Sequence, residues 1–340
     1  MRPGYRLELE QHEQARAQRP ALGVLACAVL DLALVAIGIA GLAYGGDLLV
    51  SNATRLARAL GISPLAIGMT VVAFGTSAPE LAASVVAALR GAPELALGNV
   101  VGSNIANVGL ILGASALMWP LATSWSFVKR EVAAMIVATL VASAMLLDGA
   151  LGRLEGLVLL VGLAGFLLLA LRGEGGSAAA ARDGDAAAAR ARGALARPAL
   201  LSLLGVTILA VAAHALVTGA VGLAEAWGVS ERVIGLTMVA VGTSLPELAS
   251  SIAAALRRQG DMVLGNIVGS NVFNLLSVLA VAALVRPLQG DALALRPDLV
   301  AMLIAAVVVA PIAVSGWRVG RREGLALLLA YAAYVALVLR

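Results

Sequence analysis

The sequence predicts an all-α integral membrane protein with ten transmembrane helices, arranged as two inverted five-helix repeats. Composition and an internal duplication carry this prediction. Of the 340 residues, 61% are hydrophobic and only 13% are charged, and the mean hydropathy is +0.97. A soluble domain averages about 45–50% apolar and about 25% charged residues. A chain with so few polar residues cannot cover a water-facing surface, so the composition indicates a bilayer environment.

The apolar runs are continuous over about 20 residues, the length at which an α-helix crosses a bilayer. Strands of an outer-membrane barrel would instead alternate apolar and polar residues over about 10 residues. Residues 1–20 carry four arginines and three glutamates, and we expect them to form a solvated N-terminal tail. The predicted spans that follow are 22–50, 64–90, 95–118, 129–147 and 154–172, then 199–226, 232–256, 262–285, 298–315 and 323–339.

The second half of the chain repeats the first at a constant offset. The segment "GISPLAIGMTVVAFGTSAPELAASVVAALR" begins at Gly61, and "GVSERVIGLTMVAVGTSLPELASSIAAALR" begins at Gly228. Without a gap, 28 of 51 positions are identical between residues 59–109 and 226–276. The chain therefore divides into a first repeat, 21–172, a small-residue linker, 173–198, and a second repeat, 199–340.

An odd number of spans in each repeat has a geometric consequence. The second repeat must enter the membrane from the opposite side, so the repeats are related by a pseudo-two-fold axis in the membrane plane. This inverted arrangement is common among secondary transporters.

Positive charges predict the orientation. Excluding the N-terminal tail, about 14 Lys and Arg residues lie on the linker's side and about 6 on the other side, and the side richer in these residues is usually cytoplasmic. We therefore expect a multi-pass inner-membrane protein with both termini outside and the 173–198 linker in the cytoplasm. The arginines of the tail oppose this orientation. They and the other basic residues lie at the ends of apolar runs, which gives no indication of nucleic-acid binding.

Each repeat interrupts one predicted span with polar residues. Gly75 to Glu80 reads "GTSAPE", and 167 residues later the chain reads "GTSLPE". Proline removes a backbone N–H and frees the carbonyl four residues earlier, here those of Gly75 and Gly242. Such a break must face protein or a water-filled cavity. Freed carbonyls, hydroxyls and a carboxylate are hard oxygen ligands, which suit Na⁺ or Ca²⁺.

The spacing of the polar residues brings them onto shared helix faces. Residues four apart are neighbours on a helix, and this spacing recurs in the pairs Thr76–Glu80, Thr243–Glu247, Ser103–Asn107 and Ser270–Asn274. Gly98 with Gly102 and Gly265 with Gly269 form GxxxG patterns, which allow a neighbouring helix to approach closely. Inverted symmetry would bring both sets together near the membrane midplane.

Simpler interpretations exist for each feature taken alone. GxxxG patterns and membrane-embedded Ser, Thr and Asn residues often serve only helix packing, and a single intramembrane glutamate can be structural. Two complete copies within a duplicated block favour a functional site. For Asp47 and His214, which occupy equivalent positions, we favour a helix-end or packing role over ion transfer.

The two blocks resemble the α-1 and α-2 motifs of the sodium/calcium exchanger family, within the calcium:cation antiporter superfamily, in its prokaryotic form. The motifs would occupy 68–113 and 235–280. The resemblance implies ten transmembrane helices, four central cation sites and exchange of Ca²⁺ for Na⁺ by alternating access. It implies no enzymatic activity and no cofactor.

Carried over by position, the resemblance makes Glu80 and Glu247 the central ligands for Ca²⁺ and the coupling ion. The other implied ligands are Ala73 and Ala240 through their carbonyls, Thr76, Ser77, Thr243 and Ser244, and Ser103, Asn107, Ser270 and Asn274 from the neighbouring helices. Several relatives have an aspartate at one of the last asparagine positions. Both are Asn here, which leaves two acidic ligands and leaves open the coupling ion and its stoichiometry.

Other functions remain as alternatives. The coupling ion could be H⁺ or K⁺ in place of Na⁺. A passive cation channel would be better served by a symmetric ring around an open pore. An enzyme is poorly supported, because the chain has two histidines and no HExxH motif. The sequence leaves the oligomeric state open.

Overall fold

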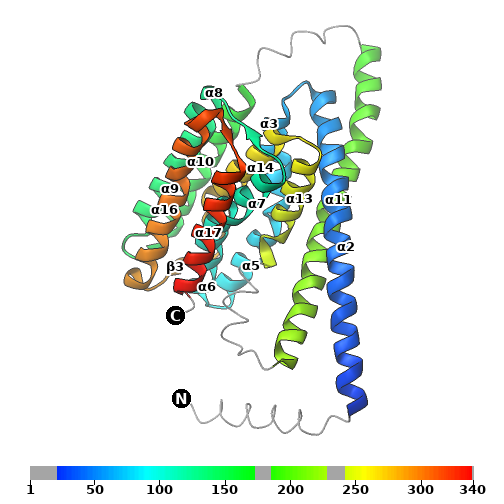
Figure 1. The fold of residues 1–340 in the computed structure, drawn as a ribbon. Helices are drawn as coiled ribbons and strands as arrows, with labels where there is room; N and C mark the ends of the chain where they lie inside the picture. The colour runs from blue at the N-terminus through cyan, green and yellow to red at the C-terminus, as the bar shows by residue number, and fades with distance from the viewer. Residues whose placement is uncertain (1–20, 173–184, 228–241, 339–340) are drawn as a thin grey trace.

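The computed structural model describes residues 21–172, 185–227 and 242–338 (Figure 1). This part of the chain consists of helices, four two-residue strands and the short loops between them. Six of its helices are long and apolar enough to cross a membrane, and a bent helix pair adds a seventh candidate. The predicted all-α membrane class is thereby confirmed.

The first repeat consists of one long helix followed by shorter segments, several of which are joined by π-helical turns. The segments are α2 (Ala21–Leu60), α3 (Pro64–Ile67), η1 (Gly68–Val72), α4 (Ala73–Thr76), α5 (Ala78–Leu89), α6 (Pro93–Ala106), η2 (Asn107–Leu112), α7 (Gly113–Met118), α8 (Trp125–Phe127), η3 (Val128–Val132), α9 (Ala133–Met145) and α10 (Arg153–Arg172).

The second repeat follows the same plan where it is described. Its segments are α11 (Asp185–Ala226), α13 (Leu245–Leu256), α14 (Gly260–Phe273), η5 (Asn274–Val278), α15 (Leu279–Val285), α16 (Ala292–Val314), the 3₁₀ turn η6 (Ser315–Trp317) and α17 (Arg321–Val338). Positions 232–241 of the predicted span 232–256 lie outside the described residues. The linker predicted at 173–198 is helical from Asp185 onward, because its alanine-rich sequence has high helix propensity.

Local sequence explains where several helices begin. Ser63 is the N-cap of α3, accepting a hydrogen bond from the Ala66 N–H, with proline at the next position. Asp291 caps α16 by accepting from the N–H groups of Leu293 and Ala294. Such side chains satisfy amide donors that the first helical turn leaves unpaired.

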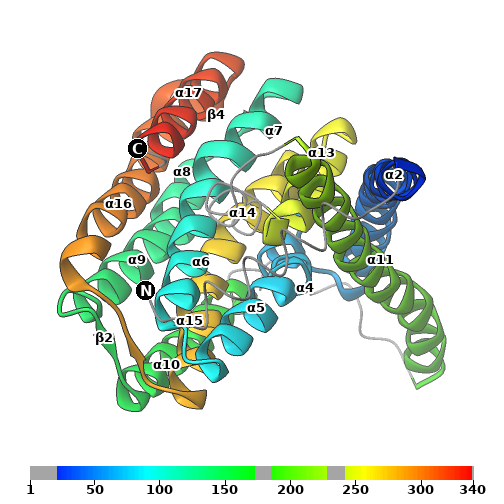
Figure 2. The same ribbon diagram turned by 90° about the horizontal axis from the view of Figure 1, so that it is seen from below.

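The long helices α2 and α11 lie side by side at one edge of the molecule in both views (Figures 1 and 2). Small residues permit this contact: a Cβ added at Gly41 would lie 2.6 Å from the Cβ of Ala212. Close approach of backbones is the usual way in which membrane helices associate, since lipid provides no hydrophobic driving force between them.

The segments Pro93–Met118 and Gly260–Val285 form the centre of the fold. Their most apolar windows are 78% and 89% buried, whereas those of the other four candidate spans are at most 28% buried. In Figure 2, α6 and α14 accordingly lie inside the bundle. These two segments carry the predicted Ser and Asn ligands.

Two short antiparallel ribbons join the repeats crosswise. β1 (Leu121–Ala122) pairs with β4 (Arg318–Val319), and β2 (Ala150–Leu151) pairs with β3 (Leu288–Gln289). Each ribbon contains one strand from each half of the chain, so the loops tie the two repeats together.

The predicted close packing at Gly265 and Gly269 is confirmed. A Cβ at Gly269 would lie 2.6 Å from the Met69 carbonyl oxygen and 2.7 Å from the Cβ of Ala73, and Gly265 lies directly against the Leu65 carbonyl. For Gly98 and Gly102, the partners equivalent by the 167-residue offset are residues 232 and 236, which lie outside the described residues.

We expect Gly269→Val to destabilise the protein, because a backbone carbonyl cannot move aside as a flexible side chain could. Overpacking of this kind costs typically about 1–3 kcal/mol. Thermal unfolding in detergent should show a lower Tm than wild type. Gly165→Ala is the control, since no described heavy atom lies within 4 Å of a Cβ built there. An unchanged Tm for Gly269→Val would refute the packing argument.

Candidate cation-binding site

Two buried carboxylates stand at equivalent helix starts. Glu80 is 0% exposed and Glu247 is 1% exposed, and they lie in the first turns of α5 and α13. Each helix begins after a break at a serine with nearly the same backbone conformation, φ −79° and ψ 3° at Ser77 and φ −87° and ψ 4° at Ser244. A helix N-terminus stabilises negative charge, so the break positions each carboxylate where its charge is favoured.

In the first repeat the break produces a measurable bend. The segments Pro64–Thr76 and Ala78–Leu89 are inclined by 42° to one another. Pro79 occupies the first turn of the second segment, where its missing N–H does no harm. The interrupted helix predicted from "GTSAPE" is therefore present.

The carboxylates bond across the repeats. Ser77 Oγ of the first repeat donates to Glu247 Oε1 at 3.1 Å, and Ser244 Oγ of the second donates to Glu80 Oε1 at 3.3 Å. The two contacts are equivalent, because Ser77 corresponds to Ser244 and Glu247 to Glu80 at the 167-residue offset. The two polar breaks, far apart in sequence, therefore meet at one site between the repeats.

The threonines before the breaks make a second crossed pair. Thr76 Oγ1 donates to Asn266 Oδ1 at 3.4 Å, and Thr243 Oγ1 donates to Asn99 Oδ1 at 3.1 Å. Asn99 in turn donates to the Glu80 carbonyl at 3.2 Å. These two asparagines hold the broken helices against α6 and α14.

Sequence reasoning missed Asn99 and Asn266. Their amides also donate, each at 2.9 Å, to Ser84 and Ser251. The signal was present, because both asparagines lie inside the duplicated blocks at the same 167-residue offset. Asn99 lies four positions before Ser103, so the same four-residue spacing that pairs Ser103 with Asn107 also includes Asn99.

The residues predicted on the central segments are all buried. Ser103 Oγ lies at a hydrogen-bond distance of 3.2 Å from Ser244 Oγ, which connects it with the Glu80 carboxylate, and Asn107 Nδ2 donates to Asn271 Oδ1 at 3.2 Å. The π-helical turns η2 and η5 begin at Asn107 and Asn274, at equivalent points of the two repeats. Such turns occur frequently at functional sites.

Several oxygens of this region have no hydrogen-bond partner among the described residues. They are Oε2 of Glu80 and of Glu247, Oδ1 of Asn107, Oγ of Ser270 and Oδ1 of Asn274. An unpaired buried polar atom costs about 1–3 kcal/mol. Carboxylate, hydroxyl and amide oxygens of this kind have the chemistry that Na⁺ and Ca²⁺ require.

Of the two predicted carbonyl ligands, Ala73 and Ala240, only Ala73 lies in the described part of the chain. The Ala73 carbonyl accepts from the Ser77 N–H at 2.9 Å, and it lies 3.4 Å from Thr76 Oγ1, as an alternative acceptor to Asn266 for the threonine hydroxyl. Ala240 lies outside the described residues. Among the residues that the structure describes, no group of three or more His, Cys, Asp or Glu side chains forms a metal cluster.

Asp47 and His214 are placed away from these oxygens. Arg257 Nε donates to Asp47 Oδ1 at 2.7 Å, in an ion pair that joins α2 to the end of α13. His214 is exposed on α11.

Comparison with known proteins decides the family. A model of the family described as "Sodium/calcium exchanger protein" matches residues 30–172 and 198–340. The chain belongs to the sodium/calcium exchanger family. It is thus a membrane antiporter for cations, and not an enzyme.

Individual relatives resemble the whole chain. The Escherichia coli inner membrane protein YrbG is 37% identical over 87% of this chain and 91% of its own. The sodium/calcium exchanger MaX1 of Methanosarcina acetivorans is 31% identical, over 91% and 98%. A solved structure of the sodium-calcium exchanger NCX_Mj aligns with TM-score 0.80 and 32% identity, over 91% of this chain and 98% of that chain.

Proposed function

We propose that this exchanger moves Ca²⁺ against Na⁺ by alternating access, with Glu80 and Glu247 as the central ligands. The crossed contacts Ser77–Glu247 and Ser244–Glu80 carry the proposal. They place one carboxylate from each repeat in a single buried site. Two carboxylates neutralise one Ca²⁺, and the surrounding hydroxyl and amide oxygens replace the water that the ion loses.

The remaining proposed ligands are those that the resemblance to the family implies. Ser103 and Ser270, with Asn107 and Asn274, supply oxygens from the central helices, while Ala73, Ala240 and the residues 76, 77, 243 and 244 supply them from the broken helices. Binding would redirect some hydrogen bonds toward the cation. The Oε2 atoms of the two glutamates have no hydrogen-bond partner among the described residues, so they can bind the ion without losing an internal hydrogen bond.

We infer ten membrane crossings in two inverted repeats. Six long apolar helices and the bent pair support this proposal, and the shorter apolar helix Leu245–Leu256 lies within the predicted span 232–256. A site shared equally by two inverted repeats is suited to alternating access, because tilting one repeat against the other exposes it to each side in turn.

Ion flux into sealed proteoliposomes tests the coupling ion. We expect an outward Na⁺ gradient to drive Ca²⁺ uptake, whereas a K⁺ gradient or a pH gradient alone does not. Uptake driven by the pH gradient or by K⁺ would favour the proton- or potassium-coupled alternative. Ca²⁺ flux without any counter-ion would favour a channel.

We further propose that both termini lie outside the cell and that the segment between the repeats is cytoplasmic. A cysteine introduced at Ala187, with Cys27 replaced by serine, should not react with an impermeant thiol reagent added to intact cells. A cysteine at Leu339 should react. Both should react after permeabilisation, which controls for accessibility. The reverse labelling pattern would mean that the arginines of the N-terminal tail set the orientation.

A further inference from the structure

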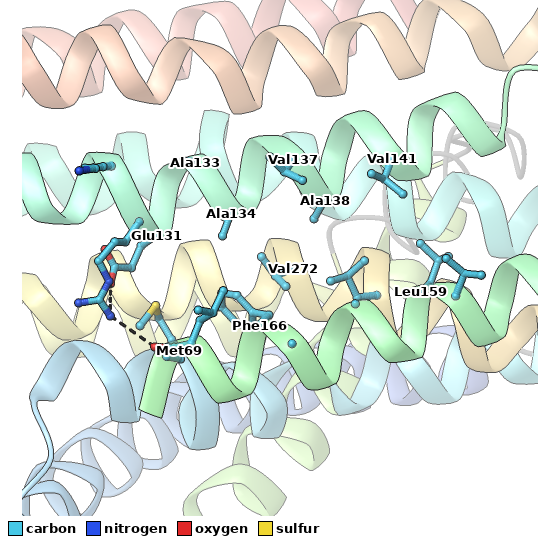
Figure 3. Close-up of a pocket in the computed structure, with 18 residues that line it drawn as sticks. Met69, Glu131, Ala133, Ala134, Val137, Ala138, Val141, Leu159, Phe166 and Val272 are labelled. Atoms are coloured by element: carbon cyan, nitrogen blue, oxygen red, sulfur yellow. Dashed lines mark hydrogen bonds and ion pairs between the residues drawn. The ribbon is translucent and has the colours of Figure 1, made fainter. Parts of the chain in front are cut away.

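A cavity lies between α9 and α10, and none of the residues that line it is a proposed cation ligand. It has a volume of about 610 Å³, within the range of about 300–1,000 Å³ usual for sites that bind small molecules. We call it the α9–α10 groove. In Figure 3 it extends from Glu131 and Met69 at one end to Val141 and Leu159 at the other. Of the 18 residues that line it, 15 are uncharged and apolar, and the three charged ones are consecutive, Lys129, Arg130 and Glu131.

The groove is open toward the outer surface of the bundle. Its rim residues Val137, Val158 and Leu169 are 58%, 49% and 65% exposed. In a membrane protein such a surface faces acyl chains. Gly165 lines the groove, and a Cβ built there meets no described heavy atom within 4 Å. The absence of a side chain on this part of α10 therefore leaves space rather than serving a close helix contact.

The charged end of the groove carries an excess of positive charge. Lys129 is exposed, and so is Arg130. Arg130 donates to the Leu169 carbonyl at 3.4 Å and lies 3.6 Å from the buried carboxylate of Glu131. These contacts hold the guanidinium at the mouth of the groove, beside the end of α10, where a lipid headgroup would lie.

We propose that the α9–α10 groove binds one anionic phospholipid, with an acyl chain along the apolar walls and the phosphate beside Lys129 and Arg130. The walls offer no polar group to a water-soluble ligand, whereas they match a hydrocarbon chain along their length. Basic pockets between transmembrane helices bind anionic headgroups. Two cations against one carboxylate give the mouth a preference for a lipid with net negative charge over a zwitterionic one.

The second repeat has the same architecture with a less basic mouth, in which Arg296 is equivalent to Lys129 but no basic residue is equivalent to Arg130. A cavity of about 410 Å³ lies between α16 and α17, lined by Ala301, Ile304, Ala305 and Val308, which follow Ala134, Val137, Ala138 and Val141 by 167 positions. Pro297 stands where the first groove has Arg130, and Asp298 where it has Glu131.

The hydrogen bonds at this second mouth also differ. The Tyr334 hydroxyl donates to Asp298 Oδ1 at 2.9 Å. Counted from the helix starts at Arg153 and Arg321, the residue of α10 that corresponds to Tyr334 is Phe166, which has no hydroxyl. The second mouth is thus closed by an internal hydrogen bond around a carboxylate. We expect headgroup selectivity at the α9–α10 groove only, and this gives the experiment its internal control.

Native mass spectrometry of the purified full-length protein, titrated with phosphatidylglycerol or phosphatidylethanolamine, tests the proposal. We expect wild type to retain one phosphatidylglycerol more tightly than phosphatidylethanolamine. Lys129→Gln with Arg130→Gln should weaken phosphatidylglycerol binding by about fivefold for each charge removed. Arg296→Gln, at the position equivalent to Lys129, should leave it unchanged.

A second variant tests whether the lipid binds in the α9–α10 groove without disturbing the fold. Gly165→Leu fills the open space and favours the helix, so it should fold normally and lose the bound lipid of either headgroup. Equal retention of the two lipids by wild type, or unchanged phosphatidylglycerol binding in the double variant, would overturn the headgroup assignment. Unchanged binding in Gly165→Leu would overturn the location. None of these outcomes depends on which ion drives transport.

Discussion

Replacing Glu80 or Glu247 by glutamine is expected to abolish Ca²⁺ exchange while leaving a folded, inserted protein. Glutamine keeps the shape and one carbonyl oxygen but removes a full charge from a site where the ion must lose its water. At a separation of about 4 Å and an effective dielectric constant of about 20, a pair of unit charges interacts by about 4 kcal/mol. That energy corresponds to roughly a thousandfold in affinity. Flux of ⁴⁵Ca²⁺ into Na⁺-loaded proteoliposomes measures the effect.

The control for this experiment is Glu94→Gln. Glu94 is also an acidic residue in the first turn of a membrane helix, α6, but it is exposed. It should keep wild-type flux and a wild-type elution profile. Near wild-type exchange by either Glu80→Gln or Glu247→Gln would show that the central site lies elsewhere.

Much of the fold could be predicted because the signals are local or periodic. Length and hydropathy of each run indicate a membrane helix, and the constant offset between Gly61 and Gly228 establishes the duplication without any knowledge of contacts. The bend after Thr76 follows from one proline. The helix from Asp185 to Pro198 lies in the predicted linker, whose small residues between two hydrophobic segments are compatible with either disorder or a transient helix, since alanine favours a helix.

The residues of the candidate site could be listed from sequence, but not their partners. Spacing predicts that Thr76 and Glu80 share a helix face; it contains no information about which side chain on the other repeat they meet. The structure pairs Ser77 with Glu247 and Thr76 with Asn266, contacts that depend on how the two repeats pack. The open groove at Gly165 could not be predicted from the sequence either, because a glycine in an apolar helix more often indicates close packing.

Charge balance at the site leads to a prediction about stoichiometry. With Glu80 and Glu247 ionised, the proposed ligands carry two negative charges, since both central asparagines are neutral. One Ca²⁺ neutralises them, and so do two Na⁺ or two protons. Three Na⁺ would leave an excess positive charge in a buried, low-dielectric site, where such an imbalance is costly. Protons compete for the same carboxylates, so exchange should slow as the pH falls.

We therefore expect wild-type Ca²⁺ exchange to be electroneutral or weakly electrogenic, and Asn274→Asp to change this. Asn274 is fully buried, and neither its Oδ1 nor its Nδ2 has a partner among the described residues, so an added carboxylate there has no internal hydrogen bond to displace. The third negative charge should raise Ca²⁺ affinity and make a third Na⁺ easier to accommodate, which increases the charge moved in each cycle. Ca²⁺ flux in proteoliposomes under a clamped membrane potential measures this for both proteins. Asn274→Gln, which adds bulk without charge, is the control and should not gain voltage dependence. A wild-type rate that already depends steeply on voltage, as exchange of three Na⁺ for one Ca²⁺ would, contradicts the charge argument and leaves the family assignment unaffected.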